Sequence, residues 1–330
     1  MSKVLTVVVP TYNVEKYIRQ NLESFEVEEI LEDLEVLIVS DGSQDGSVDI
    51  AREFADRHPD TFKIIEKENG GHGSTINRGI IEATGKYFKV VDADDWVLEE
   101  GLINLIKQLK SCDSDLVVSG FYWYHNDKDT TSVEIENPVP GTEYYKEYKV
   151  SDVCRDMYVK MHGMTVKTEI LKKIPKIDEH CFYVDVEYVM FPIPLVETIT
   201  SIPDYVYMYR IGIAGQSMDP AKMQRNQDNF DRVLERMFAF YTQCKKDGVD
   251  DAKMTYITNF LARVVASRFK IFLGFPYSRD IKKQMLEFDT RVKNEYPDIY
   301  YAIKQKAVLL LRKSKYNLYF LAQMVYKRSL

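Results

Sequence analysis

Residues 86–95 read KYFKVVDADD, a largely apolar run that ends in three carboxylates. The apolar residues predict a buried strand, and the carboxylates follow it at the edge where open α/β sheets place their ligands. Asp92 and Asp94 flank the small residue Ala93, so both carboxylates can approach one hard cation. Since acidic loops also occur by chance on protein surfaces, the sequence upstream decides how this one is interpreted.

The chain before residue 86 alternates between strand and helix patterns. Continuous apolar runs predict strands at 4–9, 35–39 and 62–66, and helical spacing predicts helices at 14–25, from the N-cap Asp45 to 57, and at 74–83. Such alternation implies a parallel sheet with right-handed crossovers. The loops after the first, second and fourth strands are therefore expected to be neighbours at one edge of the sheet.

Those loops carry groups that suit a ligand. Asp41 can accept hydrogen bonds from a nucleoside ring or a ribose, with Thr11 beside it. Gly70 and Gly71 let the backbone come close to a ligand, and Arg78 on the following helix is expected to face a phosphate. Each feature alone fits ordinary turn chemistry equally well. Their shared place at one sheet edge favours ligand binding.

Four motifs, taken in order, resemble those of family 2 glycosyltransferases. They are VVPTYN at 8–13, VSDGSQDGS at 39–47, NGG at 69–71 and DADD at 92–95. The match is specific over about the first hundred residues and can be traced to residue 217. It implies the GT-A fold, an α/β architecture with a Rossmann-like, mostly parallel sheet and flanking helices. It also implies a nucleotide-sugar donor, a divalent cation and inversion at the anomeric carbon.

The resemblance assigns roles to individual residues. It places Asp41 on the uracil or ribose, Asp92 near the ribose and the metal, and Asp94 directly on a Mg²⁺ or Mn²⁺ ion that bridges the donor's diphosphate. The family's habits favour a UDP-linked sugar. The implied donor-binding residues are Pro10, Thr11, Tyr12, Asn13, Asp41, Asn69, Gly70, Gly71, Arg78, Asp92, Ala93, Asp94, Arg210 and Ser217.

Residues 182–188, FYVDVEY, resemble the family's acidic motif at the acceptor site. The match implies that Asp185 is the general base that takes the proton from the acceptor hydroxyl. Glu187 is implied to bind acceptor hydroxyls or to orient Asp185. On a helix the two side chains diverge by roughly 200°, so only one should face the donor. The structural alternative is that Asp185 caps a helix at 186–191.

Residues 207–210, YMYR, and the glycines after them resemble a strand and a loop that close over the diphosphate. The planar donor fork of Arg210 suits a phosphate, with Ser217 further along this loop. A strand end with an ordinary glycine-rich turn is the alternative. His162 and His180 flank the expected acceptor region, whereas the histidines at 58, 72 and 125 show no metal-ligand spacing.

Composition points to a reducing compartment and away from a membrane span. The four cysteines are far apart and form no CxxC pair, which argues against a disulfide framework and against zinc. A strand pattern begins at Val4 and no apolar run approaches 18 residues, so we expect neither a signal peptide nor a spanning helix. The expected location is the cytoplasm, with peripheral contact at the inner face of the cell membrane left open.

From residue 219 strand patterns give way to amphipathic segments at 221–246, 251–273, 278–295 and 299–327. We therefore expect a glycosyltransferase domain at 1–218, with a nucleotide-sugar half at 1–97 and an acceptor half at 98–218, followed by a helical domain at 219–330. Residues 304–330 hold seven basic residues and no acid, in a chain of formal net charge −7. This segment is expected to contact an anionic membrane, to form a homodimer, or to pack as a terminal helix.

The sequence thus predicts an inverting hexosyl- or N-acetylhexosaminyltransferase of bacterial cell-surface polysaccharide synthesis. Its acceptor would be a glycan or a lipid-linked saccharide. Two other classes remain open: a sugar nucleotidylyltransferase and a non-catalytic nucleotide-binding scaffold. The first should show a glycine-rich loop with arginine after the first strand, which PTYN at 10–13 does not provide. Nucleic-acid binding is disfavoured by the acidic remainder of the chain.

Overall fold

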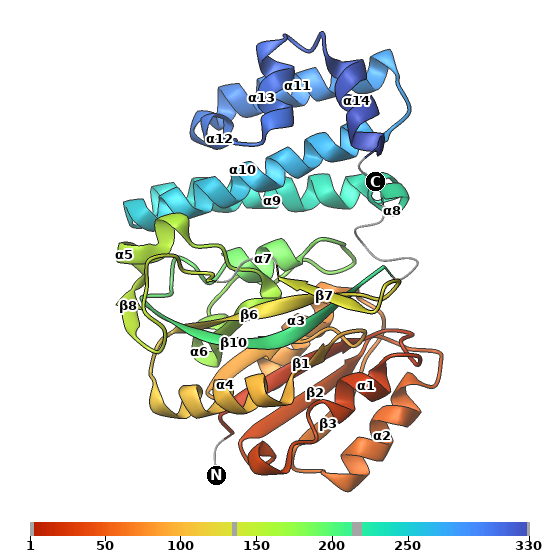
Figure 1. The fold of residues 1–330 in the computed structure, drawn as a ribbon, viewed down its shortest axis with the longest axis vertical. Helices are drawn as coiled ribbons and strands as arrows, with labels where there is room; N and C mark the ends of the chain where they lie inside the picture. The colour runs from red at the N-terminus through yellow and green to blue at the C-terminus, as the bar shows by residue number, and fades with distance from the viewer. Residues whose placement is uncertain (1–2, 134–136, 213–219, 329–330) are drawn as a thin grey trace. The chain divides into compact units, whose positions relative to one another are not determined.

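A computed structural model describes residues 3–133, 137–212 and 220–328 (Figure 1). The chain divides into two compact units, Met1–Ile213 and Ala214–Leu330, which we call the N-terminal and C-terminal units. The predicted domain boundary between residues 218 and 219 lies outside the described residues, as does Ser217.

The N-terminal unit is built on a ten-stranded sheet in the order β3-β2-β1-β4-β9-β6-β10-β5, with β7 beside β6 and β8 beside β10. Strands β1 to β4 are parallel, as are β6 and β10, while β9 runs antiparallel between β4 and β6. The strands are β1 Leu5–Thr11, β2 Leu34–Ser40, β3 Phe62–Glu66, β4 Tyr87–Val90, β5 Trp96–Val97, β6 Leu116–His125, β7 Thr130–Val133, β8 Glu147–Lys149, β9 Met164–Lys167 and β10 Thr198–Ile211.

Helices cover both faces of this sheet, which explains why β1 is apolar at almost every position. Leu5, Val7 and Val9 face a core shared with α1, α2 and α4, whereas Val8 faces α3, where Gly79 allows a close approach. The helices of this unit are α1 Ile18–Glu23, α2 Ser47–Arg57, α3 His72–Glu82, α4 Glu99–Ser111, α5 Val150–Val153, α6 Thr168–Leu171 and α7 Asp185–Met190.

The predicted mostly parallel α/β sheet is confirmed, and the four predicted strands correspond to β1–β4. The helix predicted at 14–25 is observed as the shorter α1, which begins at Ile18 and ends at Glu23. The N-cap of α2 is Gly46 rather than Asp45. The Asp45 carboxylate nevertheless accepts hydrogen bonds from the backbone and hydroxyl of Ser47, so it supports the start of this helix.

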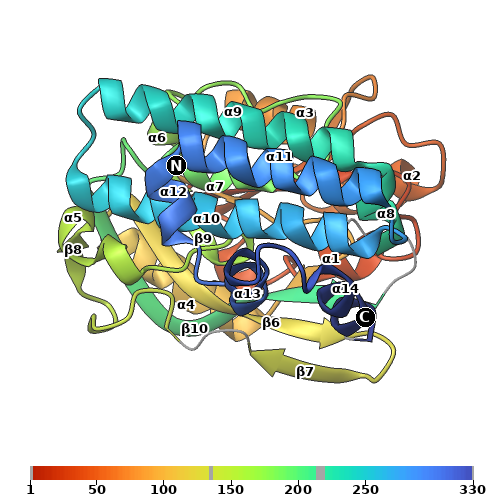
Figure 2. The same cartoon turned by 90° about the horizontal axis from the view of Figure 1, so that it is seen from above.

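All regular elements in the described part of the C-terminal unit are helices, as predicted. Helices α9, α10 and α11 run alongside one another (Figure 2). Polar side chains cap two of these helices: Asp250 accepts from backbone amides at the start of α10, and Ser278 does so at the start of α11. The helices are α8 Pro220–Arg225, α9 Gln227–Lys246, α10 Asp251–Gly274, α11 Arg279–Glu295, α12 Pro297–Ala302, α13 Lys306–Lys313 and α14 Tyr319–Arg328.

A buried ion pair holds the last helices of this unit in place. Asp289 on α11 accepts hydrogen bonds from the Arg312 guanidinium at 2.7 and 3.0 Å and from the Tyr316 hydroxyl at 2.5 Å. The guanidinium also lies over the ring of Tyr300. Within the described residues, none of the helices has the length and apolar character needed to span a bilayer.

Candidate active site

The DADD loop follows β4 and is hydrogen-bonded to residues of β10. The Tyr207 hydroxyl donates to the Asp95 carboxylate at 2.5 Å and accepts from the backbone N–H of Asp92 at 3.1 Å. The backbone N–H of Arg210 donates to the other oxygen of Asp95 at 2.7 Å. Burial and the charges of Asp94 and Asp92 raise the pKa of Asp95 well above its usual range. Asp95 is therefore a structural residue that fixes the loop.

Asp92 is held by a histidine from another loop. Its carboxylate lies 2.7 Å from Nε2 of His72, the first residue of α3. Burial opposes the charged imidazolium, but the nearby carboxylates of Asp92, Asp185 and Asp94 outweigh it and raise the pKa of His72. In turn, burial opposes the ionised carboxylate, yet His72 lowers the pKa of Asp92. The pair therefore favours an imidazolium beside a carboxylate.

Asp94 is the carboxylate of this loop that the protein leaves available. It is half-buried, and among the described residues no side chain donates a hydrogen bond to its carboxylate. Burial, with the charge of Asp92, raises the pKa of Asp94 to about 6, although Arg210 and His72 oppose this. A partly desolvated carboxylate beside a second one is the kind of donor set that a divalent cation stabilises.

The residues around Asp94 fit a metal that takes most of its ligands from elsewhere. Within the described residues, no group of three or more His, Cys, Asp or Glu side chains is arranged to hold a metal ion. Magnesium is usually bound by one or two carboxylates together with substrate phosphates and water. Asp94, with Asp92 beside it, can supply that protein share.

Asp185 approaches this group from a distant part of the chain. It is the first residue of α7, it is exposed, and its charge interacts with those of His72 and Asp92. Although water reaches it, the crowding by protein atoms raises the pKa of its carboxyl, a shift that His72 opposes and Asp92 reinforces. The N-cap of α7 is Val184, so Asp185 does not cap this helix and that alternative is wrong.

Glu187 points the other way. Its side chain is fully buried and accepts a hydrogen bond from the backbone N–H of Asp178 at 2.9 Å. Helical spacing thus exposes Asp185 and buries Glu187, as expected for two residues that diverge by roughly 200° on a helix. The backbone just before α7 is unusual, since Tyr183 has a φ of 67°, a left-handed value uncommon for residues other than glycine.

Asp41 organises the neighbouring glycine loop. Its two carboxylate oxygens accept hydrogen bonds from the backbone N–H groups of Gly70 and Gly71, each at 2.8 Å, and from Lys67 at 2.6 Å. Asn69 donates to the Asp41 carbonyl at 3.0 Å. Asp41 is only 3% exposed, so it presents little surface to a nucleoside. Its carboxylate fixes the backbone of Gly70 and Gly71.

The first loop presents Tyr12 and Asn13 rather than Pro10 and Thr11. Tyr12 is 52% exposed, and Asn13 is exposed as well. Pro10 and Thr11 are buried, and the Thr11 hydroxyl donates to its own strand at the Val9 carbonyl. This local bond arises because Thr11 still belongs to β1.

The two arginines predicted to face phosphates have protein partners here. Arg78 is exposed on α3 and pairs with Glu82 at 2.8 Å. Arg210 is only 7% exposed; it donates to the backbone carbonyl of Asp94 at 2.8 Å and lies 4.5 Å from the ring centre of Trp96. Arg210 therefore braces the DADD loop from inside the protein.

His72 is the site residue that sequence reasoning missed. It shows no metal-ligand spacing with cysteine or with another histidine, so the sequence pattern assigns it no role. The signal that could have identified it is its place directly after Gly70-Gly71, at the start of a helix on the same sheet edge as DADD. Gly71 has a φ of 82°, so the turn that presents His72 requires a residue without a side chain.

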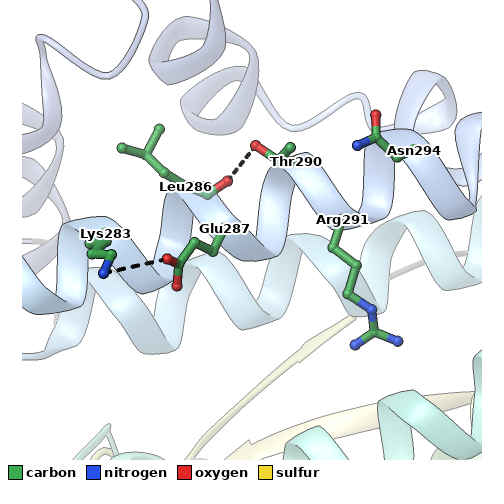
Figure 3. A pocket seen from close by; sticks show the side chains of 6 residues that line it. All are labelled: Lys283, Leu286, Glu287, Thr290, Arg291 and Asn294. Atoms are coloured by element: carbon green, nitrogen blue, oxygen red, sulfur yellow. Dashed lines mark hydrogen bonds and ion pairs between the residues drawn. The ribbon is translucent and has the colours of Figure 1, made fainter.

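A hollow of about 380 Å³ lies along α11 in the C-terminal unit (Figure 3). Its charged residues pair with other side chains: Lys283 with Glu287, and Arg291 with Glu235 and Glu295. This hollow lacks the convergent, partly buried carboxylates that mark the sheet edge.

The sequence profile of Glycosyl transferase family 2 matches residues 6–174, which include the loops after β1, β2 and β4. The chain therefore belongs to this family, as the motifs predicted. Glycosyltransferase GlyA of Streptococcus pneumoniae is 31% identical over 155 residues, or 47% of this chain and 21% of GlyA. Minor teichoic acid biosynthesis protein GgaB of Bacillus subtilis is 27% identical over 233 residues, or 68% of this chain and 25% of GgaB.

Among solved structures, residues 1–349 of S. aureus TarS have a similar fold, with a TM-score of 0.67 at 18% identity over 99% of this chain and 92% of that one. The same TarS fragment has been solved in complex with UDP-GlcNAc, where the TM-score is 0.64. The expected GT-A fold is thus confirmed. The matched part of this chain spans about a fifth to two-fifths of the first curated relatives, which is 21% of GlyA and 41% of GlyG.

Proposed function

We propose that this protein is an inverting glycosyltransferase that moves a hexosyl or N-acetylhexosaminyl group from a UDP-linked sugar to a hydroxyl of a glycan or lipid-linked saccharide, in cell-surface polysaccharide synthesis. The observation that carries this proposal is the grouping of Asp92, His72 and Asp185, with Asp94 beside them, in a family 2 chain. The UDP-GlcNAc complex of TarS and the teichoic acid role in the name of GgaB support the donor and the pathway class.

Asp185 is suited to be the general base. Its raised pKa makes it a better proton acceptor than an ordinary aspartate. The positive charge of His72 limits this rise in pKa and so favours the ionised carboxylate that a general base requires. Asp185 takes the proton as the acceptor oxygen attacks the anomeric carbon. The bond from that carbon to the diphosphate breaks on the opposite face, and its electron pair leaves with the nucleoside diphosphate.

The protein prepares the leaving-group side with Asp94 and Asp92. A Mg²⁺ or Mn²⁺ ion bound at Asp94 would neutralise the charge that develops on the diphosphate. His72 holds Asp92 in place and adds positive charge at the same edge. Hydrogen bonds from Tyr207 and Arg210 to Asp95 tie this loop to β10 and so support the carboxylates that would hold the metal.

The donor's nucleoside is proposed to lie along the loops after β1 and β2. Tyr12 offers an exposed aromatic ring against which a base can stack, and Asn13 offers an exposed amide. Asp41 supports this surface by holding the backbone of Gly70 and Gly71. The proposed place of reaction is the cytoplasm, at the inner face of the membrane if the acceptor is lipid-linked.

The test is a transfer assay with a panel of UDP-, GDP- and dTDP-sugars, in Mn²⁺ or Mg²⁺ and in EDTA. Donor hydrolysis without an acceptor gives a second readout that requires no knowledge of the acceptor. We expect turnover with a UDP-sugar that EDTA abolishes and Asp185→Asn suppresses, while the exposed control variant Glu169→Gln stays active. Full activity in EDTA would refute the proposed requirement for a metal ion. No turnover with any sugar nucleotide would refute the proposed glycosyltransferase activity.

A further inference from the structure

The last two helices of the C-terminal unit expose large apolar side chains. Phe320 is 58% exposed and Leu310 is 53% exposed. Large exposed apolar side chains that gather on neighbouring elements point to an interaction site, whereas single scattered ones do not. The exposed apolar residues of α13, of α14 and of the turn between them are Leu309, Leu310, Leu318, Phe320, Leu321 and Met324.

These side chains do not belong to a loosely packed tail. The opposite side of the same segment is buried: Leu311 and Tyr319 are each 1% exposed. The ion pair between Arg312 and Asp289, with the Tyr316 hydroxyl, fastens the turn after α13 to α11. The chain therefore builds an amphipathic segment whose inner side packs and whose outer side is held out to solvent.

Four lysines accompany the exposed apolar residues. Lys304, Lys306, Lys313 and Lys315 are all exposed, and none forms an ion pair with any described residue. Other lysines of this unit do form ion pairs, such as Lys245 with Asp298 at 2.8 Å. Residues 304–330 contain no acid, and of the basic residues at 304–315 only Arg312 forms an ion pair within the described part of the chain, with Asp289.

We propose that this surface, formed by the six apolar residues and the four lysines and called here the α13–α14 face, binds the surface of an anionic lipid bilayer. Apolar side chains that enter the headgroup boundary, flanked by lysines that meet acidic headgroups, are the composition that interfacial segments use. Arg312 is not part of this face, because its guanidinium forms an ion pair with Asp289.

Charge argues against a second copy as the occupant. In a two-fold dimer the same patch meets itself, so the four lysines of one copy would face the four lysines of the other. An anionic bilayer instead supplies the missing negative charge. This inference does not depend on the proposed sugar transfer, although it would place the enzyme where a lipid-linked acceptor is found.

The test is co-sedimentation of the full chain with vesicles of phosphatidylcholine alone, or of phosphatidylcholine mixed with phosphatidylglycerol, at low and high salt. We expect binding to the anionic vesicles only, and weaker binding at high salt because salt screens the attraction. Changing Lys304, Lys306, Lys313 and Lys315 to Gln should reduce binding about tenfold or more. The matched control changes four exposed lysines elsewhere, Lys128, Lys173, Lys246 and Lys270, and should bind as the unaltered chain does.

A second variant, Leu310→Ser with Phe320→Ser, separates apolar insertion from charge and should also lose binding. Circular dichroism and thermal unfolding confirm that both variants fold, and donor hydrolysis in solution should be unchanged in both. The proposal would be overturned if the variant of Lys304, Lys306, Lys313 and Lys315 bound vesicles as well as the four-lysine control does. It would also be overturned if the unaltered full chain did not bind. A dimer that the Leu310→Ser, Phe320→Ser variant dissociates, without vesicle binding, would assign the face to a second copy.

Discussion

Replacing Asp94 by Asn is expected to stabilise the metal-free protein while it abolishes sugar transfer. Burial, together with the charge of Asp92, raises the pKa of the Asp94 carboxyl from 3.8 to about 6 in the folded protein. In the unfolded chain the carboxyl titrates at its ordinary pKa. Since the folded state then binds the proton more tightly, ionised Asp94 lowers the free energy of unfolding at neutral pH.

The size and sign of the effect follow from that shift. A shift of about two units corresponds to ~3 kcal/mol at pH 7.5. Asp94 keeps partial access to water, so we expect Asp94→Asn to raise the free energy of unfolding by about 1–3 kcal/mol in EDTA. Below pH ~4 both states are protonated and the variant gains nothing. Its advantage should grow as the pH rises towards 6 and stay constant above.

Urea unfolding at pH 4.5 and pH 7.5 in EDTA measures this difference, with Glu169→Gln as the control. Adding Mn²⁺ and UDP should then stabilise the unaltered protein but not Asp94→Asn, because only a ligand that binds the folded state raises its stability. An equal stability of the two proteins at pH 7.5 would refute the reasoning. So would a gain of the same size at both pH values, because it would not come from the titration of Asp94.

Asp185→Asn should lower turnover by about two orders of magnitude or more while the affinity for UDP, measured by calorimetry, stays similar; an inactive Glu187→Gln beside an active Asp185→Asn would reverse their roles. Burial lowers the pKa of Lys89 to about 7, so the unfolded chain binds more protons above that pH. The stability of the unaltered protein relative to Lys89→Met should therefore rise by roughly 2–3 kcal/mol between pH 6 and pH 9 in urea unfolding, and a flat difference would contradict the burial of the charge. Arg312→Met should cost about 3–5 kcal/mol because it leaves the Asp289 carboxylate buried without its cation, and the double variant with Asp289→Leu should recover most of this loss; a cost that the second change does not relieve would point to packing instead.

The sheet edge could be predicted from the sequence because its signals are local. An uninterrupted apolar run such as β1 fits only a strand covered on both faces, and parallel strands place their following loops together. These two facts bring Asp92 close to the glycine loop without any knowledge of tertiary contacts. Asp185 was predicted from the family motifs alone. It lies far from Asp92 in the sequence, and hydrophobic periodicity does not show that two such distant residues meet.

The directions of individual side chains could not be predicted in the same way. Thr11 and Arg210 both have side chains able to bind a ligand, yet both belong to strands and turn their polar groups inwards. β1 extends two residues beyond its predicted apolar run, to Thr11, so the exposed side chains of the loop begin at Tyr12. His72 was missed for another reason: a single histidine gives no pattern, and its partner Asp92 is found only in the folded chain.

The three carboxylates of the DADD loop have separate tasks, and their protein partners show how the tasks are divided. Asp95 is engaged by Tyr207 and the backbone of Arg210, and Asp92 is engaged by His72. The guanidinium of Arg210 lies close to Asp94 but donates to its backbone carbonyl. An arginine paired with the Asp94 carboxylate itself would compete with a metal for the same oxygens. By bonding the carbonyl, Arg210 fixes the loop and leaves that carboxylate to an external cation, so we infer that Asp94 is the residue through which the donor's metal is held.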